Sequence, residues 1–174
     1  MSIYVEIGSR VNEGRLFMLF PAMPGSLMAR KMYISNEIKS MIFGPWDEQP
    51  WEERCGRLRA DFDYFLEGSL LPVAEKPFKG KTSYMKRLED HSDQVWEIRS
   101  RDPEPGLRIF GQFADKDVFV ALTWHMRADL LGPKSREWRD AILECKTEWR
   151  NLFPAYQPIT GGNLRDYVSN IVLV

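Results

Sequence analysis

The chain has 174 residues, 44% hydrophobic and 28% charged, which is typical of one soluble globular domain with a sizeable core. Its 24 Lys and Arg balance 25 Asp and Glu to a formal net charge of -1, which argues against a protein that coats nucleic acid nonspecifically. No run approaches the roughly 18 apolar residues of a membrane span, and the N-terminus lacks a secretion signal. We therefore expect a cytoplasmic protein without a membrane partner.

The first fifty residues contain two segments with regular apolar spacing. Alternation predicts a hairpin with strands at Ile3 to Ser9 and Arg15 to Phe20. The mixed apolar spacing of Ser26 to Phe43 favours a helix over most of its length.

An amphipathic helix is predicted next, because apolar residues repeat at helical spacing from Trp51 to Leu66, after Pro50 and before Gly68. The following segment, Leu70 to Ser83, contains prolines, a glycine and several lysines. This composition predicts a long connector.

Three short strands are predicted at Gln94 to Arg101, Leu107 to Ala114 and Val118 to Trp124, because residues typical of turns separate them. Helical spacing resumes from a Ser135 cap to Phe153. This helix should cover the apolar face of the sheet or one of its ends. The last residues, 171–174, are all apolar and favour either a final strand or an apolar tail.

These elements predict an α+β fold in which an antiparallel sheet with a three-strand meander packs against amphipathic helices. We expect a single domain over residues 1–174. Its core would span about 51–153, with an N-terminal hairpin and helix extension at 1–50 and a C-terminal tail at 154–174.

Strand alternation predicts that cationic side chains gather on one face of the meander, since successive side chains point to opposite faces. The residues expected on this face are Arg99, Arg101, Arg108, Phe110, Phe119, His125 and Arg127. In the third strand, Phe119, Ala121, Thr123 and His125 should share this face, opposite Val118, Val120, Leu122 and Trp124.

The helices, the strands W-E-I-R, L-R-I-F and V-A-L-T-W-H-M-R, and the final helix together resemble the RelE/ParE-like toxin superfamily, particularly its phage-associated HigB-like branch. The resemblance covers about Trp51 to Phe153. It implies the toxin of a toxin–antitoxin system, a metal-independent endoribonuclease that cuts ribosome-bound mRNA. The implied partners are the mRNA and ribosome and a cognate antitoxin, a helix-turn-helix protein.

The resemblance also assigns roles to individual residues. Arg108, His125 and Arg127 would be catalytic, and Arg99, Arg101 and Phe110 would bind RNA. Attack by the RNA 2′-hydroxyl on its own phosphate needs a base, an acid and cations. A histidine with an ordinary pKa of about 6.5 can exchange the proton, and arginine supplies a fixed, forked cation. No cofactor is expected, and the two histidines and two cysteines lack the spacing of a metal site.

Alternatives to this interpretation remain open. Arginines at alternating strand positions are often a solvated face, and Arg108 can pair with Glu97 or Asp102. His125 can bond to the backbone, and Phe110 can lie under a helix. The same scaffold also fits a non-catalytic binding module, either gyrase-directed or regulatory, or a phage structural or interaction protein that assembles through its apolar C-terminus.

Overall fold

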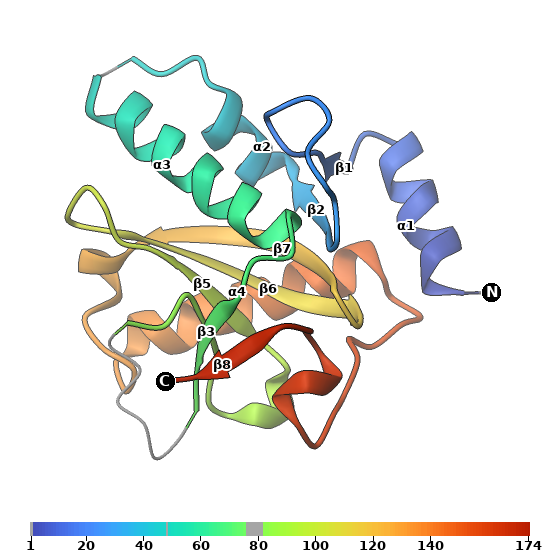
Figure 1. Cartoon of the computed structure of the whole chain (residues 1–174). Coiled ribbons are helices and arrows are strands. Elements are labelled where there is room, and N and C mark those ends of the chain that lie inside the picture. The colour runs from blue at the N-terminus through green and yellow to red at the C-terminus, as the bar shows by residue number, and fades with distance from the viewer. Residues whose placement is uncertain (1, 48, 76–81) are drawn as a thin grey trace.

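The computed structural model describes residues 2–47, 49–75 and 82–174, which form an α+β fold (Figure 1). Its helices are α1 (Ile3–Asn12), α2 (Asn36–Phe43), α3 (Gln49–Leu66) and α4 (Arg136–Leu152). The strands are β1 (Leu16–Leu19), β2 (Lys31–Ser35), β3 (Leu71–Ala74), β4 (Met85–Arg87), β5 (Trp96–Ser100), β6 (Leu107–Asp115), β7 (Val118–Met126) and β8 (Ile171–Leu173). Short 3₁₀ turns lie at His91–Asp93, Arg127–Leu130 and Leu164–Asp166.

The described residues form one eight-stranded sheet in the order β1-β2-β7-β6-β5-β4-β3-β8. Strand β6 pairs antiparallel with both β5 and β7, whereas β2 with β7, β3 with β4 and β3 with β8 are parallel. The α+β class is therefore confirmed, but the expectation of an antiparallel sheet is wrong. The predicted extension, connector and tail cause the difference, because each contributes a strand that pairs in parallel.

Helices cover both faces of the sheet (Figure 1). Helices α2 and α3 pack on one face, in a core that includes Ile38, Phe62, Ile109 and Phe119. Helices α1 and α4 pack on the other face, around Ile7, Phe110, Val120 and Cys145. Each face of the sheet thus carries its own apolar core, and α4 covers the face that was expected to hold the arginines.

The N-terminal hairpin was predicted wrongly, because Ile3–Asn12 is the helix α1. The apolar residues Ile3, Ile7 and Val11 recur every four positions and pack together against the core beneath α4. Part of the predicted helix at Ser26 to Phe43 is also wrong, since β2 occupies its middle and only α2 is helical. The hydroxyl of Ser35 accepts a hydrogen bond from the Ile38 backbone N–H and marks the start of α2.

The later elements follow the sequence more closely. Helix α3 is confirmed, and Ser135 caps α4 by accepting a hydrogen bond of 3.0 Å from the backbone N–H of Trp138. The predicted connector at Leu70 to Ser83 contains β3, and its central residues 76–81 lie outside the described residues. Of the two alternatives for the C-terminal residues, the strand is observed as β8.

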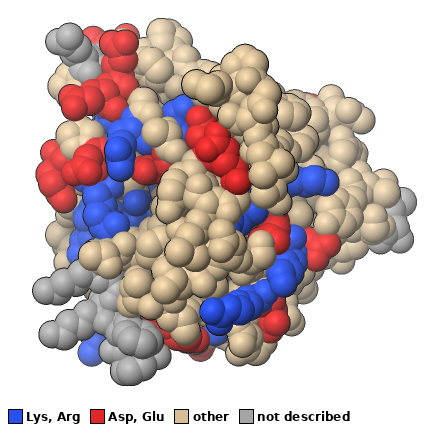
Figure 2. All heavy atoms as spheres, in the orientation of Figure 1, with Lys and Arg blue, Asp and Glu red and all other residues tan. Residues whose placement is uncertain are grey.

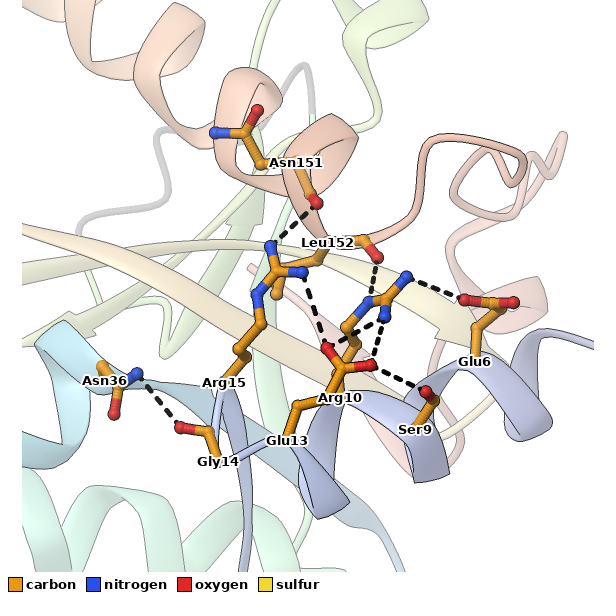
Figure 3. Close-up of polar contacts among 9 residues, drawn as sticks. All are labelled: Glu6, Ser9, Arg10, Glu13, Gly14, Arg15, Asn36, Asn151 and Leu152. Carbon is orange, nitrogen blue, oxygen red and sulfur yellow. Dashed lines mark hydrogen bonds and ion pairs between the residues drawn. The ribbon is translucent and has the colours of Figure 1, made fainter.

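Two arginines of the N-terminal segment hold the end of α4 (Figure 3). Arg10 Nε donates to the carbonyl of Leu152 at 2.7 Å, and Arg15 Nη2 donates to that of Asn151 at 2.9 Å. The last carbonyls of a helix have no partner within the helix and carry partial negative charge, so these cations stabilise its C-terminus.

Irregularities in the β6–β7 pairing change which residues share a face. The register shifts between Phe110 and Gly111, where Phe110 faces Thr123 but Gly111 faces Ala121. Such a bulge leaves one residue unpaired and reverses the alternation beyond it. Phe119 and Ala121 consequently lie in the core beneath α2 and α3, and placing them with His125 was wrong.

Candidate functional site

The strand register places Arg99, Arg108 and His125 in one row across β5, β6 and β7. Arg99 pairs with Arg108 and Arg108 pairs with His125. Side chains at directly opposed positions of neighbouring strands have Cβ atoms roughly 5 Å apart. The three residues that the sequence placed on one face are therefore direct neighbours there.

Arg101 and Arg127 lie two positions beyond the row, just after β5 and β7 end. The backbone N–H of Arg127 donates to the carbonyl of Gly106 at 2.7 Å, which fixes it beside the β5–β6 turn. Both guanidinium groups act electrostatically on Arg108. We call Arg99, Arg101, Arg108 and Arg127 the arginine cluster.

A buried carboxylate lies beside the arginine cluster. Glu97 is 0% exposed, and its Oε1 accepts a hydrogen bond of 2.6 Å from Arg99 Nε. Its Oε2 lies 3.5 Å from Arg108 Nε. The sequence named Glu97 only as an alternative partner of Arg108. Its position two residues before Arg99 on the same strand is the signal that identifies it as part of the site.

Ser83, just before β4, also contacts the cluster. Arg99 Nη1 donates to the Ser83 hydroxyl at 2.7 Å, and Arg101 Nη2 donates to the Ser83 carbonyl at 2.5 Å. These contacts hold two guanidinium groups in fixed positions at the end of β5. An arginine fixed in this way loses less conformational entropy when it binds a ligand.

Burial and neighbouring charges shift the pKa values of two arginines in the cluster. The pKa of Arg108 is lowered to about 10, mainly by burial and also by the charges of the three other arginines, while Glu97 opposes the shift. Burial also lowers the pKa of Arg101, although Glu97, Asp102 and Asp61 act in the opposite direction. Guanidinium groups gathered in this way can attract an anion such as phosphate, although Glu97, Asp102 and Asp61 offset part of their charge.

His125 ends the row next to helix α4. Its Nε2 lies 3.3 Å from a carboxylate oxygen of Glu144, and its ring centroid is 5.4 Å from that of Phe110. Burial lowers the pKa of the imidazole, while the carboxylates of Glu144 and Asp129 raise it. The net effect is a pKa below the ordinary value, which favours the neutral imidazole that can accept a proton.

Phe110 has no surface open to a nucleic-acid base. Its side chain is 0% exposed, and its ring packs 5.8 Å from that of Trp138 on α4. The alternative in which it lies under a helix is thus the one observed, and stacking on RNA would require α4 to move. The Arg127 guanidinium lies over the ring of Trp138, 5.8 Å from the centroid of that ring.

On the surface shown in Figure 2, Lys and Arg side chains are interspersed with Asp and Glu side chains. Among the described residues, no group of three or more His, Cys, Asp or Glu is placed to hold a metal ion. No helix in the described ranges is both long and apolar enough to cross a membrane.

Comparison with known protein families, with characterised proteins and with solved structures gave no match to this chain.

Proposed function

We propose that this chain is a metal-independent endoribonuclease of the RelE/HigB-like kind, the toxin of a toxin–antitoxin system, acting in the cytoplasm on ribosome-bound mRNA. The observation that supports this proposal is the row of Arg99, Arg108 and His125, flanked by Arg101 and Arg127. The row combines an imidazole whose pKa is lowered by burial with neighbouring guanidinium groups.

In the proposed reaction, the RNA 2′-hydroxyl attacks the adjacent phosphorus and the 5′-oxygen of the next nucleotide leaves. Neutral His125 accepts the proton of the 2′-hydroxyl, and Glu144 stabilises the imidazolium that forms. Arg108 and Arg127 stabilise the negative charge that develops on the phosphate oxygens. Arg99 and Arg101 bind neighbouring phosphates. The leaving 5′-oxygen takes up a proton from solvent or from the imidazolium. The products are a 2′,3′-cyclic phosphate and a free 5′-hydroxyl.

Induced expression tests this proposal directly. Wild-type protein should arrest growth and fragment mRNA, whereas Arg108→Ala should not. Arg136→Ala is the matched control, because the Arg136 side chain is 83% exposed and pairs with Asp140 on the same helix. Equal growth of cells that express wild type and Arg108→Ala would refute the catalytic assignment.

Analysis of the cleaved ends tests the chemistry. Purified protein should cut mRNA on ribosomes in the presence of a chelator and leave the cyclic phosphate. His125→Gln should reduce cleavage by about 100-fold or more, which is the usual contribution of a general base. Cleavage that persists unchanged in this variant would show that His125 is not the base.

A non-catalytic binding module, either gyrase-directed or regulatory, is the second candidate. It is favoured by the internal contacts of the row: Glu97 engages Arg99 and Arg108, and His125 Nε2 faces Glu144. Inhibition of gyrase by purified protein that leaves ribosome-bound mRNA intact would favour this candidate.

The third candidate, a phage structural or interaction protein, takes the apolar C-terminus as an assembly segment. Residues Ile171–Leu173 form β8, which pairs with β3 and is the last strand of the described sheet, so assembly would use its other edge. In the toxin proposal, the partner that restrains the protein is a helix-turn-helix antitoxin that covers the arginine cluster.

A further inference from the structure

A pocket of about 470 Å³ lies on the face of the sheet opposite the arginine cluster. This volume falls within the range of about 300–1,000 Å³ that is usual for small-molecule sites. Three tryptophans line it, with the ends of α2 and the start of α3 as its walls. The lining residues are Glu37, Ser40, Met41, Trp46, Asp47, Trp51 and Trp124.

The tryptophans come from three separate segments and are held in place individually. Trp46 Nε1 donates to the carbonyl of Met41 at 2.6 Å, which fixes the ring against the end of α2. Trp51 and Trp124 meet edge to face, with centroids 5.6 Å apart and planes inclined by 76°. All three are only partly buried, so apolar aromatic surface remains at the pocket.

Two carboxylates give this aromatic pocket a negative charge. Glu37 Oε1 accepts a hydrogen bond of 3.3 Å from the backbone N–H of Trp124, which positions it at the pocket. Asp47 also lines the pocket. Lys39 on the same helix as Glu37 lies instead 3.5 Å from the ring centroid of Phe17. Among the described residues, neither carboxylate has a Lys or Arg partner within ion-pair distance.

We infer that this pocket binds an N-methylated ammonium group. The face of a tryptophan ring is electron-rich and attracts a cation, and several rings around one point make a site for quaternary ammonium. The perpendicular arrangement of Trp51 and Trp124 fits a compact, rounded cation, whereas a flat base is best held between parallel rings. The two carboxylates select a positive charge over a neutral group of the same shape.

One further cation is close to the pocket but does not occupy it. Arg54 lies 5.7 Å from the ring centroid of Trp51. Its Nη1 donates to the carbonyls of Pro103 and Pro105, so its charge is held outside the lining. The site is distinct from the proposed ribonuclease site, because Trp124 faces the α2 and α3 core whereas His125 faces α4.

Calorimetry with the full chain tests this inference. Choline and tetramethylammonium should bind saturably, and 3,3-dimethylbutanol, the neutral isostere of choline, should bind at least about tenfold more weakly, since each cation–π contact in a desolvated site contributes strongly. A peptide that carries trimethyl-lysine, compared with its unmodified form, is the second arm. Tighter binding of choline would identify a free small molecule as the source, and tighter binding of the methylated peptide would identify a modified protein; either supports the inference.

Variants link the binding to the pocket. Trp51→Leu should weaken choline binding by about tenfold or more, and Glu37→Gln by several-fold. Glu53→Gln, which removes an exposed carboxylate of α3 outside the lining, should leave it unchanged. If Trp51→Leu does not fold, the exposed Glu37→Gln still provides the test. Equal binding of the neutral isostere, absence of saturable binding, or unchanged binding by Glu37→Gln would overturn the inference.

Discussion

Replacement of Glu97 by Gln should destabilise the protein substantially, although the two side chains have nearly the same size. The variant leaves Arg99 and Arg108 without the buried carboxylate that lies 2.6 and 3.5 Å from their guanidinium nitrogens. Removal of one partner of a buried ion pair costs about 3–5 kcal/mol. Because Gln retains the volume and one acceptor oxygen, we expect the lower value, a loss of about 3 kcal/mol.

Urea unfolding followed by tryptophan fluorescence and circular dichroism measures this loss. For a chain of this size, about 3 kcal/mol corresponds to a decrease in melting temperature of roughly 6–12 °C. The matched control is Glu104→Gln in the exposed β5–β6 turn, which should change the free energy of unfolding by no more than about 0.5 kcal/mol. A loss below about 1 kcal/mol for Glu97→Gln, or an equal loss in the control, would refute the reasoning.

Added phosphate extends the same experiment to the anion site. The anion should restore part of the stability of Glu97→Gln, because it replaces the lost negative charge and binds only the folded protein. The stability difference between the variant and wild type should therefore be smaller in phosphate than in sodium chloride at matched ionic strength. An identical difference in the two salts would show that the arginine cluster holds no surplus charge for an anion.

Three further substitutions test the elements that position the site. Gly111→Ala should cost at least about 2 kcal/mol in urea unfolding, because its Cβ would lie 2.2 Å from the backbone carbonyl of Val120; a neutral effect would contradict the described bulge. Ser135→Ala should cost about 1 kcal/mol through loss of the α4 cap, with no loss expected for the conservative Ser135→Thr. The hydrogen bond from Tyr4 to Asp115 raises the pKa of the phenol to about 12, so its contribution to stability should be present below pH 10 and be lost as the pH rises to about 12. An ultraviolet titration should lose one late-titrating phenol in Tyr4→Phe, and an unchanged titration would contradict the assignment.

The sequence predicted the arginine and histidine row because alternation is a local property of each strand. Arg99 and Arg108 lie on regularly paired strand segments, and Arg101 directly follows β5. His125 and Arg127 come after the bulge within β7. Phe119 precedes that bulge, so the same rule placed it on the wrong face. A bulge depends on how the partner strand pairs and on the close approach of Gly111 to Val120 and Phe119. The sequence of one strand contains no signal for either.

The helical cover over the site was harder to predict, because it depends on contacts distant in the sequence. Phe110 is apolar on an otherwise polar strand face, and only the placement of α4 shows that it belongs to a core. In the N-terminal segment, Ile3, Val5 and Ile7 alternate like a strand, whereas Ile3, Ile7 and Val11 also fit a helix. Over so short a segment, the strand period and the helical period fit equally well. Packing against the core shared by α1 and α4 favours the helix.

The position of β2 constrains the order in which the protein can fold. Strand β2 lies inside the sheet between β1 and β7, and residues 31–34 pair with 118–121. During synthesis, β1 and β2 therefore emerge long before β7, and the backbone edge of β2 that pairs with β7 stays unpaired until then. Pairings between distant segments form slowly and leave strand edges exposed to other chains. The N-terminal third should accordingly depend on chaperones or on rapid completion of the chain, and fragments that end before β7 should aggregate.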